Sequence, residues 1–176
     1  MMEKIPESEL VLNPDGSIYH LKLKPEHIAN DIIIVGDQGR VSKVSSNFDS
    51  IEHKMLNREF CTHTGTFRGK RITAMSTGIG PDNIDIVLNE LDAIVNIDLE
   101  TRTVKEDKVS LNIIRLGTSG ALQEDVPVDS MVMSSYGLGF DGLLNFYDSK
   151  EVVEEKMTTA FIDHTEWGED LSKPYI

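Results

Sequence analysis

Two glycine-bounded segments carry side chains that could bind an anion. Gly36–Arg40 follows an apolar, β-branched run, and Gly117–Gly120 follows a predicted strand that contains Arg115. Glycines let the backbone approach a ligand, and successive N–H groups can form a nest for an anion. The planar guanidinium of Arg40 fits phosphate oxygens, and the two hydroxyls in the second segment could bind an oxyanion or a sugar hydroxyl. On spacing alone, an ordinary turn with a surface arginine explains Gly36–Arg40 slightly better.

Two further motifs resemble enzyme signatures, but their structural context is missing. Gly117–Ala121 resembles the G-x-S-x-G nucleophile elbow, but residues 123–127 form a predicted turn where the elbow requires a helix. Gly137–Gly142 spells G-x-G-x-x-G, but no predicted helix starts at Gly142 and no strand with a terminal acid follows at the required distance. A serine hydrolase and a dinucleotide-binding enzyme are therefore disfavoured.

Three polar residues alternate along one predicted strand. Glu59, Cys61 and His63 would share one face of that strand. No second histidine or cysteine pairs with them at the spacing of zinc ligands, so a polar strand face explains them better than a zinc site. Binding of an alkali ion through Glu59 remains open.

The charge balance excludes several classes of partner. The 176 residues include 17 Lys and Arg and 30 Asp and Glu, a formal net charge of −13. Such a surface repels nucleic acids and anionic membranes, so an anionic substrate would need a local positive site. The single Cys61 and the lack of an apolar leader or spanning segment predict a cytoplasmic protein. The length predicts one domain over residues 1–176.

Alternating strands and helices must position these segments. The apolar patterns predict strands at 32–35, 51–67, 71–77, 111–116 and 130–135. They also predict a short helix between Gly39 and Phe48, a helix capped by Asp82 or Asn83, and a final helix at about 150–163. This alternation indicates an α/β fold with one central sheet, whose ligands bind at the carboxyl ends of the strands.

Five segments, in order and in register, resemble the nucleoside phosphorylase family and in particular its uridine phosphorylases. Gly36–Arg40 resembles the family's G-D-P-x-R, and Asn57–Phe60 resembles its H/N-R-E-F. Ser76–Gly80 matches S-T-G-I-G, and Ile114–Gly120 resembles R-I-G-T-x-G. Phe140–Gly142 resembles a later D-G segment. The resemblance implies a mixed central β-sheet flanked by helices. It also implies phosphorolysis of uridine to uracil and ribose 1-phosphate, in pyrimidine nucleoside salvage.

The resemblance assigns roles residue by residue. It implies a phosphate site formed by Gly36, Arg40, Arg115 and Thr118, with Arg40, Arg115 and Thr118 also catalytic. Arg58 would reach the phosphate of a neighbouring subunit, and His20 would bind the ribose 5′-hydroxyl across the same interface. Ser119 and Gly120 would line the sugar or base region together with Thr118. Glu59, Ile79 and Asn83 align with residues that can hold a potassium ion.

The partners implied are a nucleoside, inorganic phosphate as co-substrate and a second copy of the chain. The family's subunits share sites within homodimers or larger homo-oligomers, and no cofactor beyond a potassium ion is expected. Nucleic acid and membranes are not expected partners.

Two departures from the family pattern matter. Gln38 stands where the phosphate loop usually has proline, which predicts weaker preorganisation of that loop. The chain also ends at Ile176, so it resembles a C-terminally truncated member without the family's Q-x-R pair and E-M-E segment. Such a chain should expose apolar surface on its sheet.

Three interpretations therefore stay open. The chain is part of an active uridine phosphorylase, a non-catalytic homologue that binds phosphate or forms oligomers, or a relative acting as a purine nucleoside phosphorylase or nucleosidase. The run Gly137–Tyr147 favours the uridine group.

Overall fold

The apolar run after Asn30 forms an interior strand of a five-stranded sheet in the computed structural model, which describes residues 4–176. The strands are β1 (Asp31–Val35), β2 (Ser50–Asn57), β3 (Phe60–Phe67), β4 (Lys70–Ser76) and β7 (Asn112–Arg115), in the order β2-β3-β4-β1-β7. β1 pairs in parallel with both β4 and β7, whereas β2, β3 and β4 pair antiparallel. The predicted mixed α/β sheet is confirmed.

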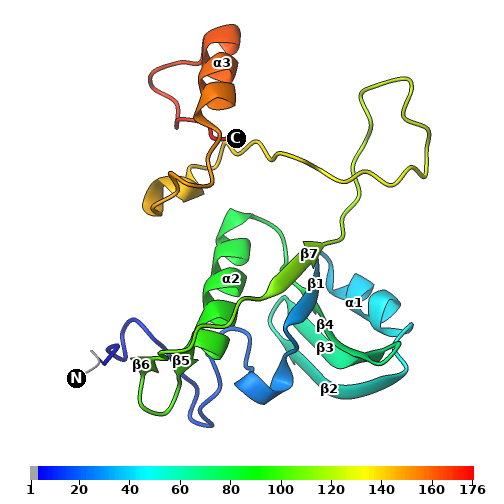
Figure 1. Cartoon of the computed structure of the whole chain (residues 1–176), viewed down its shortest axis with the longest axis vertical. Helices are drawn as coiled ribbons and strands as arrows, with labels where there is room; N and C mark the ends of the chain where they lie inside the picture. The colour runs from blue at the N-terminus through cyan, green and yellow to red at the C-terminus, as the bar shows by residue number, and fades with distance from the viewer. Residues whose placement is uncertain (1–3) are drawn as a thin grey trace. The chain divides into compact units, whose positions relative to one another are not determined.

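One helix covers each face of this sheet (Figure 1). Successive side chains of a strand point to opposite faces. Ile32 and Ile34 of β1 therefore pack in one cluster with Leu91 of α2 (Pro81–Asn96), whereas Val35 packs in another with Val41 of α1 (Gln38–Ser45). All of these side chains are buried, so both helices are held by apolar contacts at the sheet.

The segment 51–67, predicted as one long strand, is a hairpin. The turn at Arg58–Glu59 separates β2 from β3, and Asn57 pairs directly with Phe60 across it. Arg58 has φ +54°, the left-handed conformation that tight hairpin turns require and that an alternating apolar pattern does not reveal. The predicted hairpin tip at Arg68–Gly69 is confirmed, with both residues at positive φ.

Helix α2 starts one residue earlier than predicted and without the predicted side-chain cap. Pro81 occupies its first turn and Gly80 is the N-cap, with no side-chain cap hydrogen bond. Proline is favoured at this position because its missing N–H would have no partner within the helix. Because the helix already begins at Pro81, Asp82 and Asn83 lie inside it and not at its cap. The smaller elements of this part are η1 (Pro25–His27), β5 (Ile97–Asp98) and β6 (Thr103–Val104).

The chain divides into two compact units, Met1–Thr118 and Ser119–Ile176, and the single domain expected from the length stays a prediction. The second unit contains η2 (Leu143–Phe146) and α3 (Glu155–Thr165). Phe140, Phe161 and Trp167 form its aromatic cluster, with the rings of Phe140 and Trp167 stacked at 5.3 Å. The predicted final helix is confirmed as α3.

The predicted strand at 130–135 is wrong. These residues are irregular, and Met131 and Met133 are 99% and 94% exposed. A strand needs a partner for its backbone groups, and no segment of residues 4–176 pairs with this one.

Apolar surface is also exposed at the edge strand β7, in agreement with the expectation from the sequence. Among the described strands, β7 pairs with β1 alone, and Ile114 is 63% exposed. Across residues 4–176, none of the helices has the length and apolar character needed to span a membrane.

Candidate functional site

The carboxyl ends of the parallel strands bring three of the predicted segments together. Gly36 follows β1, Gly78 follows β4, and Arg115 ends β7. A Cβ atom placed on Gly36 would lie 3.8 Å from the Gly78 carbonyl oxygen and 3.9 Å from Nη2 of Arg115. The Arg115 guanidinium therefore lies beside the loop after β1, at the predicted edge of the sheet.

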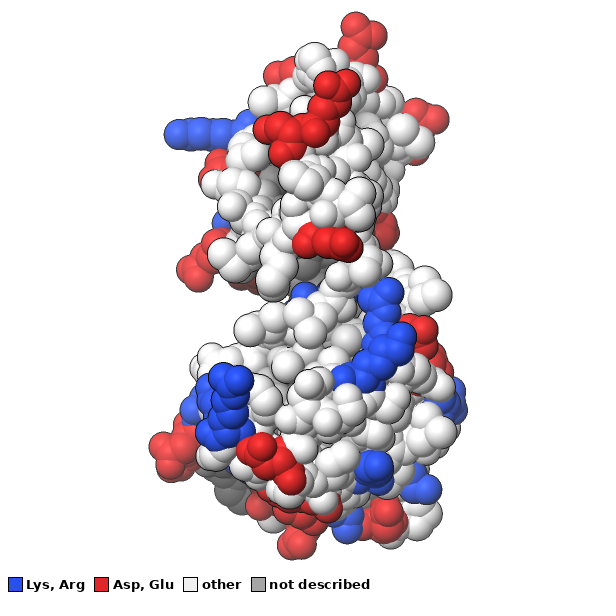
Figure 2. All heavy atoms as spheres, turned by 90° about the vertical axis from the view of Figure 1, so that its right-hand side faces the viewer, with Lys and Arg blue, Asp and Glu red and all other residues white. Residues whose placement is uncertain are grey.

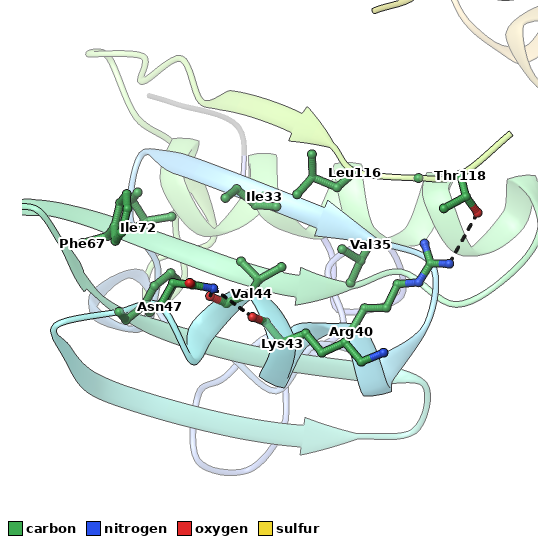
Figure 3. A pocket seen from close by; sticks show the side chains of 12 residues that line it. Ile33, Val35, Arg40, Lys43, Val44, Asn47, Phe67, Ile72, Leu116 and Thr118 are labelled. Atoms are coloured by element: carbon green, nitrogen blue, oxygen red, sulfur yellow. Dashed lines mark hydrogen bonds between the residues drawn. The ribbon is translucent and has the colours of Figure 1, made fainter. Parts of the chain in front are cut away.

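Arg40 joins this edge from the first turn of α1. Asp37 caps the helix by accepting a hydrogen bond from the N–H of Gly39 at 2.7 Å. From there Arg40 Nη2 makes a long hydrogen bond of 3.5 Å to Thr118 Oγ1, just beyond the end of β7 (Figure 3). Two guanidinium groups, a hydroxyl and the glycine loop thus meet at one place.

In the described part of the chain, these arginines have no acidic partner. The ion pairs within residues 4–176 involve neither Arg40 nor Arg115 nor Arg58. Every arginine of the chain lies in the first unit. Figure 2 shows both blue basic and red acidic side chains on the body with the sheet, and mostly red acidic ones on the body with α3. An acidic chain thus keeps a local cationic site with hydrogen-bond donors free for an oxyanion.

An apolar cavity of about 600 Å³ adjoins this cationic edge. It lies on the α1 face of the sheet, and Arg40 and Thr118 form one end of its lining (Figure 3). Val44 of α1, Ile72 of β4 and Leu116 are among its apolar walls. Leu116 is 43% exposed, so these apolar walls lie beside the charged donors without closing over them.

Arg58 and His20 form a second cluster. The Arg58 guanidinium lies 5.6 Å from the centre of the Tyr19 ring, and the centres of the Tyr19 and His20 rings lie 4.8 Å apart in a T-shaped arrangement. In the described chain, no hydrogen bond, ion pair or ring contact joins either residue to Arg40, Arg115 or Thr118. This grouping agrees with the expectation that both serve a neighbouring subunit, a role that stays a prediction.

Gln38 links the two clusters in a way that sequence reasoning missed. Its Nε2 donates a 2.6 Å hydrogen bond to the backbone carbonyl of Arg58. A proline, usual here in the family resembled, has no side-chain donor. The expected loosening of the loop is therefore accompanied by a new restraint between Gly36–Arg40 and the hairpin turn.

Glu90 of α2 was also missed, because a glutamate on a helix has no distinguishing sequence signal. Its carboxylate accepts hydrogen bonds from His20 and Leu21. Ser119 and Gly120 follow Thr118 in the chain but belong to the second unit, so their role near sugar or base stays a prediction.

The predicted potassium ligands lie together around Gly78. A Cβ atom on Gly78 would lie 2.7 Å from Asn83 Nδ2 and 2.9 Å from Glu59 Cγ, so these two side chains flank the glycine. Asn83 also donates a 3.0 Å hydrogen bond to the carbonyl oxygen of Ile79. The cluster offers a carboxylate, an amide oxygen and a backbone carbonyl, oxygen donors of the kind that hard cations bind.

The predicted polar strand face is only partly present. Glu59 lies in the hairpin turn, whereas Cys61 and His63 lie on β3 with Sγ and Nε2 3.8 Å apart. Burial raises the pKa of the Cys61 thiol and lowers the pKa of His63. Within residues 4–176 no group of three or more His, Cys, Asp and Glu side chains could hold a metal ion.

Comparison with known proteins identifies the family. Residues 31–167 match the model of the phosphorylase superfamily. A uridine phosphorylase of Thermococcus kodakarensis is 30% identical over 94% of this chain and 56% of its own length. A DeoD-type purine nucleoside phosphorylase of Streptococcus suis is 30% identical over 77% of this chain and 54% of its own length.

A solved structure gives the same result. The Trypanosoma brucei nucleoside phosphorylase, described as showing uridine phosphorylase activity, superposes with a TM-score of 0.80 at 34% identity, over 94% of this chain and 56% of its own. The chain thus spans about half the length of the curated relatives it matches. The match over most of the chain, with the strand order and the arginine-lined sheet edge, shows that the chain belongs to the phosphorylase superfamily.

Proposed function

We propose that this chain carries the phosphate site of a uridine phosphorylase-like enzyme, which cleaves uridine with inorganic phosphate to uracil and ribose 1-phosphate. The observation that carries the proposal is the meeting of Gly36, Arg40, Arg115 and Thr118 at one sheet edge, where no acidic residue of the described range 4–176 pairs with the arginines. Two guanidinium forks and a loop N–H match the oxygens of a phosphate dianion.

The chemistry requires holding and orientation rather than a covalent nucleophile. A phosphate oxygen forms a bond to C1′ of the ribose while the bond from C1′ to the base nitrogen breaks. The bonding electrons leave with the base, which takes a proton from solvent or from the site. Arg40, Arg115 and Thr118 would fix the phosphate below the sugar, and the positive charge developing on the sugar would be stabilised by that bound dianion.

Purine nucleosides are the second candidate substrates. The Streptococcus suis relative matches at the same identity as the Thermococcus one, although over less of this chain. The run Gly137–Tyr147 still favours uridine. A non-catalytic role in phosphate binding or assembly is the third alternative, because the chain spans about half of its relatives.

The proposal includes a homo-oligomer with shared sites, in which Arg58 and His20 contribute to the site of a neighbouring subunit. Ile79, which is 93% exposed beside the Glu59 and Asn83 cluster, supports a contact surface there. Light scattering should then show at least a dimer. A monomer at assay concentration would contradict the shared-site arrangement.

The test has a binding arm and a catalytic arm. Thermal unfolding of the chain is followed with increasing phosphate, and saturation at 100 times Kd should add about 2.7 kcal/mol of stability. Arg40→Ala and Arg115→Ala should abolish most of this gain. Arg68→Ala is the matched control, because Arg68 lies at the hairpin tip before β4, the opposite end of the sheet.

The catalytic arm follows uridine and inosine by absorbance, with and without phosphate. Phosphate-dependent cleavage of uridine that is lost by about 100-fold or more in Arg40→Ala would support the proposal. If phosphate still stabilised both arginine variants as much as the unaltered chain, the assigned phosphate site would be refuted. Cleavage of inosine without cleavage of uridine would contradict the uridine assignment and identify purine nucleosides as the substrates.

A further inference from the structure

The polar groups of His20 are almost all engaged by fixed partners. Its N–H donates to both carboxylate oxygens of Glu90, at 3.0 and 3.1 Å, and its carbonyl accepts from Asn57 Nδ2 at 2.7 Å. Its ring Nδ1 lies 2.7 Å from Glu90 Oε1. Within residues 4–176, Nε2 is the polar atom of His20 that has no hydrogen bond, and the side chain remains 31% exposed.

Glu90 is well placed to dictate how this ring is protonated. Its side chain is only 13% exposed, and its second oxygen also accepts the Leu21 N–H at 2.8 Å. A carboxylate that already receives two backbone N–H groups is an acceptor for the ring as well. The neutral His20 ring must then carry its proton on Nδ1, which leaves the lone pair of Nε2 free.

We infer that Glu90 is a positioning residue, which holds His20 so that Nε2 accepts a hydrogen bond from a hydroxyl group of the nucleoside sugar. The inference deepens the proposed function and rests on it for the identity of the ligand. The assignment of the ring proton to Nδ1 does not depend on the proposed function, because it is argued from the contacts of Glu90.

The surroundings of His20 favour this role. The Tyr19 ring and the imidazole pack in a T-shaped arrangement, and the Arg58 guanidinium lies over the Tyr19 ring. The next residue, Leu21, is fully buried and fixes the backbone beside His20. The ring therefore has little freedom to turn, and an acceptor that is already oriented loses less entropy when it binds a ligand.

A purely structural role for Glu90 makes a different prediction. The carboxylate would then serve only to bind the N–H groups of residues 20–21, and the ring could take either tautomer. Nitrogen-15 NMR of histidine-labelled protein at alkaline pH separates the two cases, because protonated and unprotonated ring nitrogens have different shifts. A His20→Gln variant assigns the signal.

The wild-type chain should show His20 protonated at Nδ1. Glu90→Ala should move it to the Nε2–H tautomer that predominates in free histidine, whereas Glu90→Gln should keep Nδ1–H through its amide oxygen. Asn57→Ala is the matched control, because it frees the carbonyl of the same residue without touching the ring. An Nε2–H tautomer in the wild type overturns the inference, even if Glu90→Ala fails to fold. So does an unchanged tautomer in folded Glu90→Ala.

A binding measurement then tests the ligand. Uridine should bind about two- to tenfold more tightly than 5′-deoxyuridine, and Glu90→Ala should remove most of that preference. Equal wild-type affinities would overturn the hydroxyl role. Absence of nucleoside binding, with Nδ1–H intact in the spectrum, would instead overturn the proposed function and leave the positioning of His20 standing.

Discussion

Gly78→Ala tests the packing around the predicted cation site with a single methyl group. Gly78 has φ +75°, and an added Cβ would lie 2.7 Å from Asn83 Nδ2 and 2.9 Å from Glu59 Cγ. The left-handed backbone costs a residue with a Cβ about 1–2 kcal/mol, and overpacking costs about 1–3 kcal/mol more. We therefore expect the free energy of unfolding to fall by about 2–5 kcal/mol.

Gly69→Ala separates the two contributions. Gly69 has φ +78°, almost the same backbone, but a Cβ there meets nothing within 4 Å. In Gly69→Ala the free energy of unfolding should therefore fall only by the cost of the left-handed backbone, about 1–2 kcal/mol. Urea unfolding followed by far-UV circular dichroism gives both free energies. Equal losses in the two variants would refute the close approach of Glu59 and Asn83 to Gly78.

Three further predictions follow from individual contacts. Gln38→Ala removes the hydrogen bond to the Arg58 carbonyl and should cost about 0.5–1.5 kcal/mol; an unchanged urea midpoint would contradict it. Burial and the neighbouring His27 lower the pKa of His53, so the unfolded chain takes up a proton first as the pH falls. Stability should therefore decline below the ordinary histidine pKa of about 6.5, and His53→Gln should flatten that decline in urea titrations at several pH values. Burial and a hydrogen bond to a carboxylate raise the pKa of Tyr175 to about 12, so absorbance titration should show one late tyrosine that Tyr175→Phe removes.

The sequence was sufficient for features that depend on local pattern. The apolar run at 32–35 predicted β1 and the periodic stretch after Pro81 predicted α2, because burial imposes a period on each strand and helix. The glycine loops predicted a ligand-binding edge of the sheet, and the binding itself stays a prediction. Strand partners are not encoded locally. The apolar pattern at 130–135 therefore predicted a strand that has no partner.

The residues of the site were named from the sequence, but their grouping was decided by the tertiary structure. Arg40 meets Thr118 across 78 positions of the chain, whereas Arg58 lies beside Tyr19 instead. The bond between Glu90 and His20 joins residues 70 positions apart, from a helix position that looks like any surface glutamate. Periodicity reports which side of an element is buried; only the packing of α2 and the β2–β3 hairpin against the sheet determines which polar groups then meet.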